Sequence, residues 1–383
     1  MSAKQILADL TAFDSILNHR TAAPGDLETS RWLIEACKSA GLTAQLREFP
    51  FARREISVAR LELKGGAVIK GVPLFDAQDT HSHGIEGQLG ESGSDAPIGL
   101  VRFTPQGAVP PNTMLDAVRK STSHAALIAL SAAETVVPGL ALHNADHYGT
   151  PFGPPVLQVA SESRSVLETA AKNRESVSLL ISSRWEQARA TNVDLIIQGT
   201  DPKSPAVVIY TPKSAWWTCT AERGGGLVVW LALMRYFAKN PPQATMHFTA
   251  NSGHELGHLG MRRFLAEYPE LALKAEFWVH LGANFATKGS RLLLQADTAE
   301  RLAPLIEALK KQGITDYQTT PFGQMPLGEA KNIHEQGGCY VSMLGGNRWF
   351  HHPEDRLATS VDLERCVSIV AAYLDCIPAL INT

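Results

Sequence analysis

The residues best suited to chemistry lie in one segment, Met246–Phe264, which reads MHFTANSGHELGHLGMRRF. Alternating apolar residues predict a strand over Met246–Ala250, and the Asn-Ser-Gly that follows predicts a turn. His254 and Glu255 therefore stand at a strand-to-helix corner. In open α/β sheets, ligands and metals collect outside the carboxyl ends of the strands, so this His-Glu pair is a candidate site.

Two interpretations of this segment compete. In the first, His254, Glu255 and His258 form the HExxH motif of a zincin-type metalloprotease, with two zinc-binding His on one face of a helix and Glu255 as base. That motif needs a continuous helix, and an interior glycine costs a helix about 1 kcal/mol relative to alanine. Three glycines stand where the helix is needed, namely Gly253, Gly257 and Gly260. The second interpretation depends on the surrounding loops.

Three further loops with polar residues follow predicted strands. They are Thr211–Gly226 (TPKSAWWTCTAERGGG), His280–Asn284 (HLGAN) and Asn347–Asp355 (NRWFHHPED). Together with SGHELG, their order and spacing resemble the M28 family of zinc-dependent aminopeptidases. In that family successive loops carry H-x-D, G-A-x-D-x-x-S-G, E-E-x-G-x-x-G, N-x-D and H-x-P-x-D.

The resemblance extends over nearly the whole chain. Residues 20–42 (RTAAPGDLETSRWLIEACKSAGL) resemble the leader segment of the family, and residues 57–189 resemble its protease-associated insertion domain. The segment LGEAKNIHEQGGCYV, residues 327–341, resembles the stretch before the last strand. What differs from the family pattern is the set of metal ligands.

The resemblance implies one metal rather than two. The first metal of the family needs a His and an Asp at positions that here read Thr211 and Gly282, and neither is a good zinc ligand. The second metal would be held by Glu222 (at the position of the bridging carboxylate), Glu255 and His351, with a fourth position open for water. This set resembles that of the single-zinc glutaminyl cyclases of the same fold. The implied cofactor is one divalent metal, expected to be zinc.

The position of the general base has also changed. The family has the first Glu of E-E there, and this chain has His254, whose unperturbed pKa near 6.5 lets it move protons at neutral pH. His280 lies two residues before Gly282 and could reach the vacated pocket.

Other residues of these loops are candidates for substrate contact, namely Trp216, Trp217, His280 and Arg348. Basic residues near the site point to an anionic group on the substrate, but surface solvation explains them equally well. Structural alternatives stay open throughout: Glu222 pairing with Arg223 or Lys213, His254 as a hydrogen-bonding residue, and the tryptophans in a core.

The elements that must position these loops follow from the hydrophobic pattern. After residue 190, predicted strands (193–198, 206–211, 246–250, 276–281, 290–295, 339–344) alternate with predicted helices (224–238, 260–268, 298–312, 361–380). This pattern predicts the α/β class, with a mostly parallel, mixed sheet covered by helices on both faces. Two amphipathic helices, at 2–18 and 27–40, and a strand at 42–51 precede it.

Residues 57–189 have a different texture, with short strands separated by Pro- and Gly-rich turns and one helix at 114–120. We therefore predict an M28-like α/β catalytic domain over 1–56 and 190–383, interrupted by a β-rich insertion domain over 57–189. The insertion contains several histidines and an aspartate in loops, which we expect to be solvated: His81, His83, His143, Asp146 and His147.

Composition narrows the functional classes. The chain has 383 residues, of which 44% are hydrophobic and 19% charged, with a net charge of −3, as in an ordinary soluble protein. It has no basic run that would indicate nucleic acid and no window that would span a membrane. Five cysteines without a CxxC pair indicate reduced thiols and a cytoplasmic location. The expected partner is a small-molecule or peptide substrate, and the chain could form a homo-oligomer.

These observations favour a metal-dependent hydrolase of the aminopeptidase or amidohydrolase type, acting on an amide or related C–N bond with a single-metal site. The predicted metal ligands are Glu222, Glu255 and His351, and His254 is the predicted catalytic residue. Two alternatives remain, namely a metal-free binding or scaffold protein on the same fold and the zincin.

Overall fold

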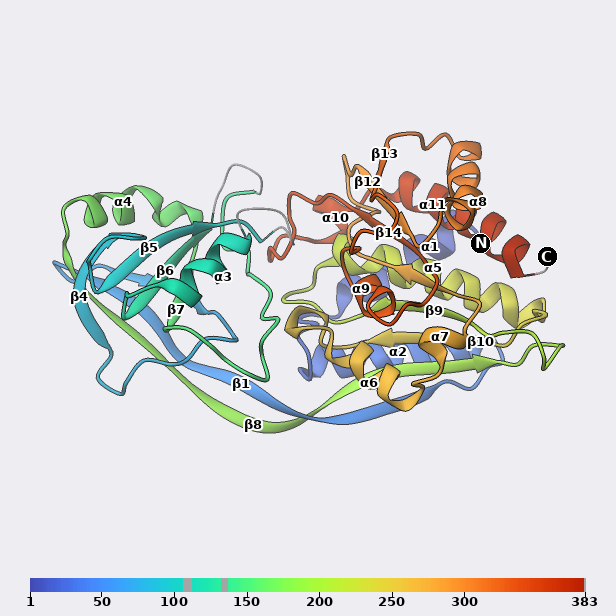
Figure 1. Cartoon of the computed structure of the whole chain (residues 1–383), viewed down its shortest axis with the longest axis horizontal. Helices are drawn as coiled ribbons and strands as arrows, with labels where there is room; N and C mark the ends of the chain where they lie inside the picture. The colour runs from blue at the N-terminus through green and yellow to red at the C-terminus, as the bar shows by residue number, and fades with distance from the viewer. Residues whose placement is uncertain (106–111, 132–136, 382–383) are drawn as a thin grey trace.

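The computed structural model describes residues 1–105, 112–131 and 137–381 (Figure 1). Its helices are α1 (Ala3–Ser15), α2 (Pro24–Ser39), α3 (Asn112–Ser121), α4 (Arg164–Lys172), α5 (Thr220–Lys239), α6 (Leu259–Glu267), α7 (Leu271–Lys274), α8 (Ala299–Lys311), α9 (Ala330–His334), α10 (Leu357–Ser360) and α11 (Leu363–Ile381), with 3-10 turns η1 (Ser161–Ser163) and η2 (His254–Leu256). Its strands are β1 (Gln45–Leu63), β2 (Val68–Lys70), β3 (Val72–Pro73), β4 (Ile85–Glu91), β5 (Ile98–Phe103), β6 (Ala126–Ser131), β7 (Val156–Val159), β8 (Ser176–Ile197), β9 (Val207–Pro212), β10 (Met246–Asn251), β11 (Phe277–Leu281), β12 (Leu292–Ala296), β13 (Tyr317–Thr319) and β14 (Tyr340–Gly345).

A mixed sheet forms the centre of the larger part of the molecule, which we call the inner lobe. Its strands lie in the order β13-β12-β14-β11-β9-β10-β8. The middle strands β14, β11, β9 and β10 run parallel, whereas β12 and β8 pair antiparallel with their neighbours in this row. The predicted α/β class with a mostly parallel, mixed sheet is therefore confirmed.

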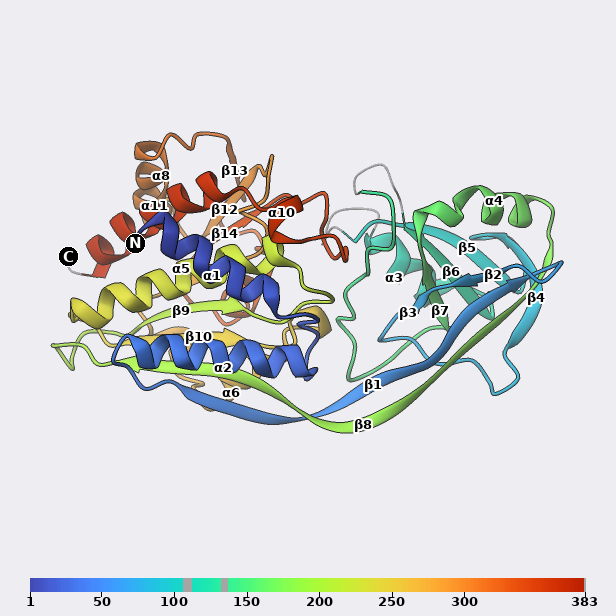
Figure 2. The ribbon, with the colours of Figure 1, turned by 180° about the vertical axis from the view of Figure 1, so that it is seen from behind.

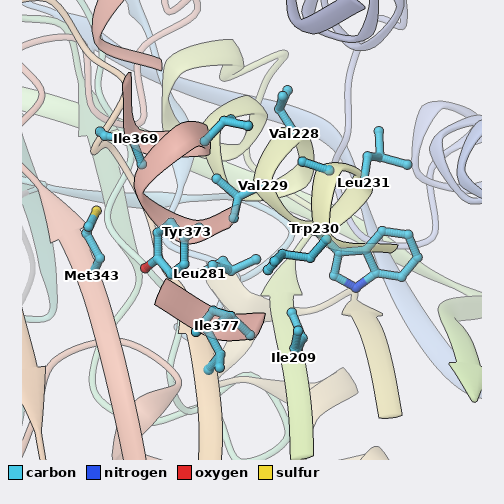
Figure 3. Close-up of a cluster of buried hydrophobic side chains, with 14 of the residues drawn as sticks. Ile209, Val228, Val229, Trp230, Leu231, Leu281, Met343, Ile369, Tyr373 and Ile377 are labelled. Atoms are coloured by element: carbon cyan, nitrogen blue, oxygen red, sulfur yellow. The ribbon is translucent and has the colours of Figure 1, made fainter. Parts of the chain in front are cut away.

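Helices cover both faces of this sheet. On one face α1, α2, α5, α8 and α11 enclose the main hydrophobic core (Figure 2). Figure 3 shows part of that core, where Trp230 of α5 and Tyr373 of α11 lie among side chains from β9, β11 and β14. On the other face α6, α7 and α9 pack on a second cluster around Trp278. Parallel strands buried on both faces are expected to be apolar throughout, and β9 and β11 are buried at every position.

Two long antiparallel strands, β1 and β8, join the inner lobe to a second one (Figure 1). The outer lobe consists of β2–β7, α3, α4 and the adjoining ends of β1 and β8, with cores of its own. The sequence predicted separate short strands at both places, at 42–51 and 58–63 and again at 178–181 and 193–198. Each pair is one continuous strand, so the predicted domain boundaries at 57 and 189 fall inside strands rather than in linkers.

The outer lobe is anchored on this ribbon by a buried arginine. Arg54 lies in β1, and its guanidinium donates to the carbonyls of Leu74, Phe75 and Ala77 and pairs with Asp79.

Within residues 1–105, 112–131 and 137–381, no helix has the length and apolar character needed to cross a membrane.

Candidate functional site

The carboxyl ends of β9, β10, β11 and β14 meet at one edge of the inner sheet, and the four predicted loops begin there. The first loop ends at α5, which starts at Thr220, four residues before its predicted start. Asp355 of the fourth loop caps this helix, because its carboxylate accepts hydrogen bonds of 3.0 Å from the backbone N–H groups of Ala221 and Glu222. The cap places the Glu222 side chain at the helix N-terminus, inside the loop cluster.

Glu222 and His351, two of the predicted metal ligands, lie together. Glu222 Oε1 is 3.3 Å from Nε2 of His351, and both side chains are fully buried. The Nδ1–H group of His351 donates to the carbonyl oxygen of Leu142 at 2.7 Å, which directs Nε2 toward the carboxylate. The guanidinium Nη2 of Arg223 lies 2.7 Å from the same Oε1. Burial alone would raise the pKa of Glu222, but Arg223 and His351 outweigh it and hold that pKa at about 2.

The third predicted ligand, Glu255, does not join them. Its Oε1 accepts hydrogen bonds from the backbone N–H of Thr21, at 3.1 Å, and from the Thr21 hydroxyl, at 2.5 Å. Its Oε2 accepts from the hydroxyl of Ser214 at 2.7 Å. Both oxygens are thus occupied by protein donors, and the carboxylate ties the N-terminal segment to the first loop.

The predicted zinc site is therefore not assembled in this structure. Two of its residues offer buried atoms without hydrogen-bond partners, namely both oxygens of Glu222 and Nε2 of His351, but a catalytic zinc requires three protein ligands. Among the described residues, the group of potential ligands that converges contains Cys219, Glu222 and Asp355. Asp355 is committed to capping α5, and burial raises the pKa of the Cys219 thiol well above its usual value, which disfavours the thiolate.

The zincin alternative fails on backbone geometry. The 3-10 turn over His254–Leu256 is followed by Gly257 and His258 in left-handed conformations, with φ of 84° and 62°, before α6 begins. No continuous helix carries the HExxH motif. His258 instead stacks on His254, with ring centroids 4.8 Å apart, and its Nδ1 lies 2.7 Å from Oδ1 of Asn332.

Thr211 and Gly282, which stand where the resemblance places ligands of a first metal, are both closely packed. Thr211 donates its hydroxyl proton to the carbonyl oxygen of Leu281, at 2.8 Å. At Gly282 a Cβ atom would lie 2.7 Å from the backbone oxygen of Met343, so β14 leaves no room for a side chain. His280 is buried nearby, with Nδ1 2.8 Å from the hydroxyl of Ser342 and Nε2 without a partner.

His254, the predicted proton carrier, has an acidic partner. Its Nδ1 lies 3.2 Å from Oε1 of Glu329, a fully buried residue just before α9. Burial, and then the nearby charge of Arg223, lower the pKa of His254 well below its usual value, so the ring is neutral at pH 7. Burial raises the pKa of Glu329. A carboxylate that accepts the Nδ1–H bond leaves Nε2 as the basic nitrogen of His254.

His254 lines a cavity of about 610 Å³ beside these loops. The polar lining includes His258, His280, Asn284 and Lys331, whereas Glu222 and His351 lie outside the lining. The apolar lining is supplied by Leu293, Met325, Leu327, Leu344 and Phe350. A volume in this range suits a small molecule or the end of a peptide.

A loop of the outer lobe forms part of the wall of this cavity. His143, Asn144 and Asp146 line it, and the backbone N–H of Ala145 donates to the carbonyl oxygen of Glu255 at 2.8 Å. His81 and His83 are exposed, as expected for loop residues. The expectation that His143 is solvated is wrong, since both of its ring nitrogens are buried without a partner.

Glu329, His258 and Lys331 were also missed as site residues. Glu329 and Lys331 belong to residues 327–341, which resemble the family segment before the last strand. The resemblance assigned no role to any residue of that segment. His258 was known only through the rejected motif.

The other candidates for substrate contact lie outside the cavity lining. Trp216 is buried against Phe75, with ring centroids 4.8 Å apart, and Trp217 donates its indole N–H to the backbone oxygen of His351. Arg348 is exposed, with its guanidinium over the ring of Trp349. These residues therefore hold loops together or face solvent.

Two basic residues near the loops, Lys213 and Arg356, have acidic partners inside the protein. Lys213 is fully buried and pairs with Asp26, and its ammonium donates to the hydroxyl of Ser252. Arg356 pairs with Asp14 at 3.0 Å. Lys331 is the basic residue that the cavity does contain.

No family model matches the chain. A stretch of 189 residues, 48% of the chain, is 25% identical to the vacuolar membrane protease of Kluyveromyces lactis, and the chain spans about a fifth (20%) of the length of that relative. Among solved structures, the peptidase M28 precursor of Shewanella amazonensis SB2B matches with a TM-score of 0.77 at 14% identity, covering 100% of this chain and 96% of its own. The zinc aminopeptidase BSAP of Bacillus subtilis matches with a TM-score of 0.75 at 17% identity, covering 97% and 94%.

A glutaminyl cyclase of Tannerella forsythia also matches, with a TM-score of 0.51 at 10% identity over 98% of both chains. At these identities the likeness is one of fold. The resemblance predicted from the sequence is confirmed at that level: the chain has the α/β fold of the M28-type zinc aminopeptidases.

Proposed function

We propose that this protein is a hydrolase that cleaves an amide or related C–N bond in a small molecule or at the end of a peptide. The observation that carries the proposal is the pair of His254, which lines the cavity, and Glu329 behind it. A neutral imidazole with one nitrogen oriented by a carboxyl group is the arrangement that general-base catalysis uses.

The chemistry assigned to these residues is two successive proton transfers, one when water attacks the carbonyl carbon and one when the C–N bond breaks. Nε2 of His254 takes a proton from water while the water oxygen bonds to the carbonyl carbon of the substrate. The C–N bond then breaks, and the same proton returns to the leaving nitrogen. Lys331 lines the same cavity, and its ammonium is the charge available to the oxygen that becomes negative.

The names of the structural neighbours support hydrolysis, since they include a zinc aminopeptidase and an M28 peptidase, and the curated relative is a protease. A zinc ion, when bound, would polarise the carbonyl and lower the pKa of water. If the hydrolase uses a single metal, Glu222 and His351 are the two residues that would hold it. A cytoplasmic location, reduced cysteines and self-association remain part of the proposal.

A non-catalytic binding protein is the second candidate, favoured by one observation. Glu255, at the position of a metal ligand in the resemblance, is turned away and used as a structural hydrogen-bond acceptor. The same cavity would then recognise a small molecule without changing it.

The test is hydrolysis of a panel of aminoacyl amides, short peptides and small linear and cyclic amides, followed by mass spectrometry of the products. We expect turnover of at least one class and a loss of roughly 100-fold or more in kcat for His254→Ala. His247→Ala is the matched control, because His247 lies in β10, the strand that leads to His254, but packs against Tyr268. Turnover in His254→Ala equal to that of the wild type would remove His254 from the reaction. A ligand that binds unchanged, with no substrate found, would favour the binding protein.

A further inference from the structure

The Glu222 carboxylate already has a cation beside it. Arg223 Nη2 lies 2.7 Å from Oε1 of Glu222, and neither side chain is exposed. The guanidinium is fixed from a second side, because its Nε donates to the backbone oxygen of Ser214 at 2.7 Å. An arginine held at two points cannot swing away from the carboxylate without losing both interactions.

The position that a metal would need lies next to this guanidinium. An ion bound by Glu222 and His351 would be about 2 Å from Oε1 and from Nε2, which are themselves 3.3 Å apart. Arg223 Nη2 is 2.7 Å from that same oxygen. A divalent ion and a guanidinium would therefore be brought within a few ångströms of each other in a buried site, where charges of like sign repel strongly.

The remaining ligands are committed elsewhere. Glu255 accepts three hydrogen bonds from Thr21 and Ser214, so its move toward a metal would leave buried donors unpaired. Asp355 accepts from two backbone N–H groups, from the hydroxyl of Ser360 and from the side-chain amide of Asn347. In the described part of the chain, neither Glu255 nor Asp355 is thus free to complete a site around Glu222 and His351.

We propose that Arg223 takes the place of a metal ion beside Glu222, so that the chain carries a permanent Glu222–Arg223–His351 cluster and binds no stoichiometric zinc there. In this arrangement Arg223 is a positioning residue. It neutralises the carboxylate, which lies 3.3 Å from Nε2 of His351, and His351 contacts the outer lobe through the carbonyl of Leu142. This proposal does not depend on what reaction the cavity supports.

The test is a metal titration of the full-length protein that needs no substrate. The chain is purified without an affinity tag, treated with a chelator, and titrated with Zn²⁺ and with Co²⁺, whose visible spectrum reports coordination by protein ligands. We expect less than about 0.1 zinc per chain after gel filtration and no zinc-dependent shift in Tm, because the Arg223 guanidinium lies beside Glu222 and would repel the ion. One zinc per wild-type chain, lost in Glu222→Gln and in His351→Ala, would overturn the proposal.

A gain of binding on removing the guanidinium tests the role of Arg223 directly. Arg223→Met keeps much of the side-chain volume and frees the carboxylate, so it should show Co²⁺ or Zn²⁺ binding that the wild type lacks, weaker than at a three-ligand site, with Glu222 and His351 as the two ligands. The double variant Arg223→Met/His351→Ala should lose that binding. Arg54→Met, which removes another buried arginine in the outer lobe, should gain none.

Arg223→Lys keeps the positive charge and should exclude metal as the wild type does. A folded Arg223→Met that binds no metal would show that Arg223 is not what keeps metal out, and the proposal would fall. If Arg223→Met does not fold, the wild-type titration decides alone. Failure of the hydrolase proposal would appear only in the substrate panel, so the two results are separable.

Discussion

Nδ1 of His254 and Oε1 of Glu329 lie 3.2 Å apart although 75 residues separate them in the chain. His254 stands at the end of β10, and Glu329 immediately precedes α9, on the segment that leads into β14. The orientation of the proposed base is therefore set by a different part of the fold, and the two residues act as one unit.

Glu329→Gln tests that unit. The amide keeps the size of the side chain but removes the charge that orients Nδ1–H and stabilises a protonated ring. We expect kcat to fall roughly 10- to 1,000-fold with little change in KM, as for an orienting carboxylate, and the acidic limb of the pH–rate profile to shift. Glu335→Gln, on the exposed end of the same segment, is the control. An unchanged profile would contradict a role in proton transfer.

Glu255→Ala is expected to destabilise the fold. The substitution leaves the N–H and hydroxyl of Thr21 and the hydroxyl of Ser214 without their acceptor in a buried place. The free energy of unfolding should fall by roughly 2–4 kcal/mol, measured by urea denaturation. Glu276→Ala on the surface should change it little. Full stability in Glu255→Ala would mean that these hydrogen bonds are not what the carboxylate contributes.

Asp194 makes stability depend on pH. Burial raises its pKa to about 6, and a hydrogen bond from Thr249 and the charge of Arg47 only partly offset that effect. Above that pH the carboxylate is charged in both the folded and unfolded states, and the full penalty of burying it is present. As pH falls from about 6 toward 4, the folded state takes up the proton first, so the free energy of unfolding rises.

Asp194→Asn should remove this trend. The variant should be more stable than the wild type at pH 8 by about 1–3 kcal/mol, the order expected for a shift of about two pKa units, and the difference should vanish near pH 4. Chemical denaturation over this range measures it, with Asp375→Asn on the surface of α11 as control. Parallel pH profiles for Asp194→Asn and the wild type would show that Asp194 does not titrate in this range.

Gly282→Ala tests whether the end of β11 leaves room for a side chain beside β14. The new Cβ would lie 2.7 Å from the backbone oxygen of Met343 and 2.9 Å from Cγ of Leu344, so β14 must shift. We expect a loss of roughly 1–3 kcal/mol in thermal unfolding, as for an overpacked core. Gly346→Ala, where a Cβ meets nothing within 4 Å, should be close to neutral. A neutral Gly282→Ala would mean that this strand tolerates a side chain there.

Much of the inner lobe was predictable because its elements carry local signals. Period-two alternation marked β10 and apolar runs marked the buried strands, and the helix predicted at 27–40 ends where Gly41 adopts a φ of 80°. The sequence predicted short strands in place of the continuous β1 and β8. The middle residues of these strands are partly exposed and lack a continuous apolar pattern.

The site was less predictable because its contacts are long-range. Glu222 and His351, which the resemblance places in one site, lie side by side in the structure, and their role as metal ligands stays a prediction. The orientation of the Glu255 side chain was not predictable, because its hydrogen-bond partner Thr21 lies 234 residues away in the chain. The pairing of Arg223 with Glu222 was kept as an alternative, and only the fold shows that both are sealed from solvent.

The ribbon of β1 and β8 has a mechanical consequence for the cavity. Residues Gln45–Leu63 pair with β8 along almost their whole length, with a single irregularity in register between Ile56 and Val58. Such a ribbon has no swivel point, so a change in the angle between the lobes must spread as small torsions over many paired residues. The loop that carries His143 is therefore held in place beside His254 by a ribbon that resists bending at any single residue and by the backbone hydrogen bond from Ala145 to Glu255.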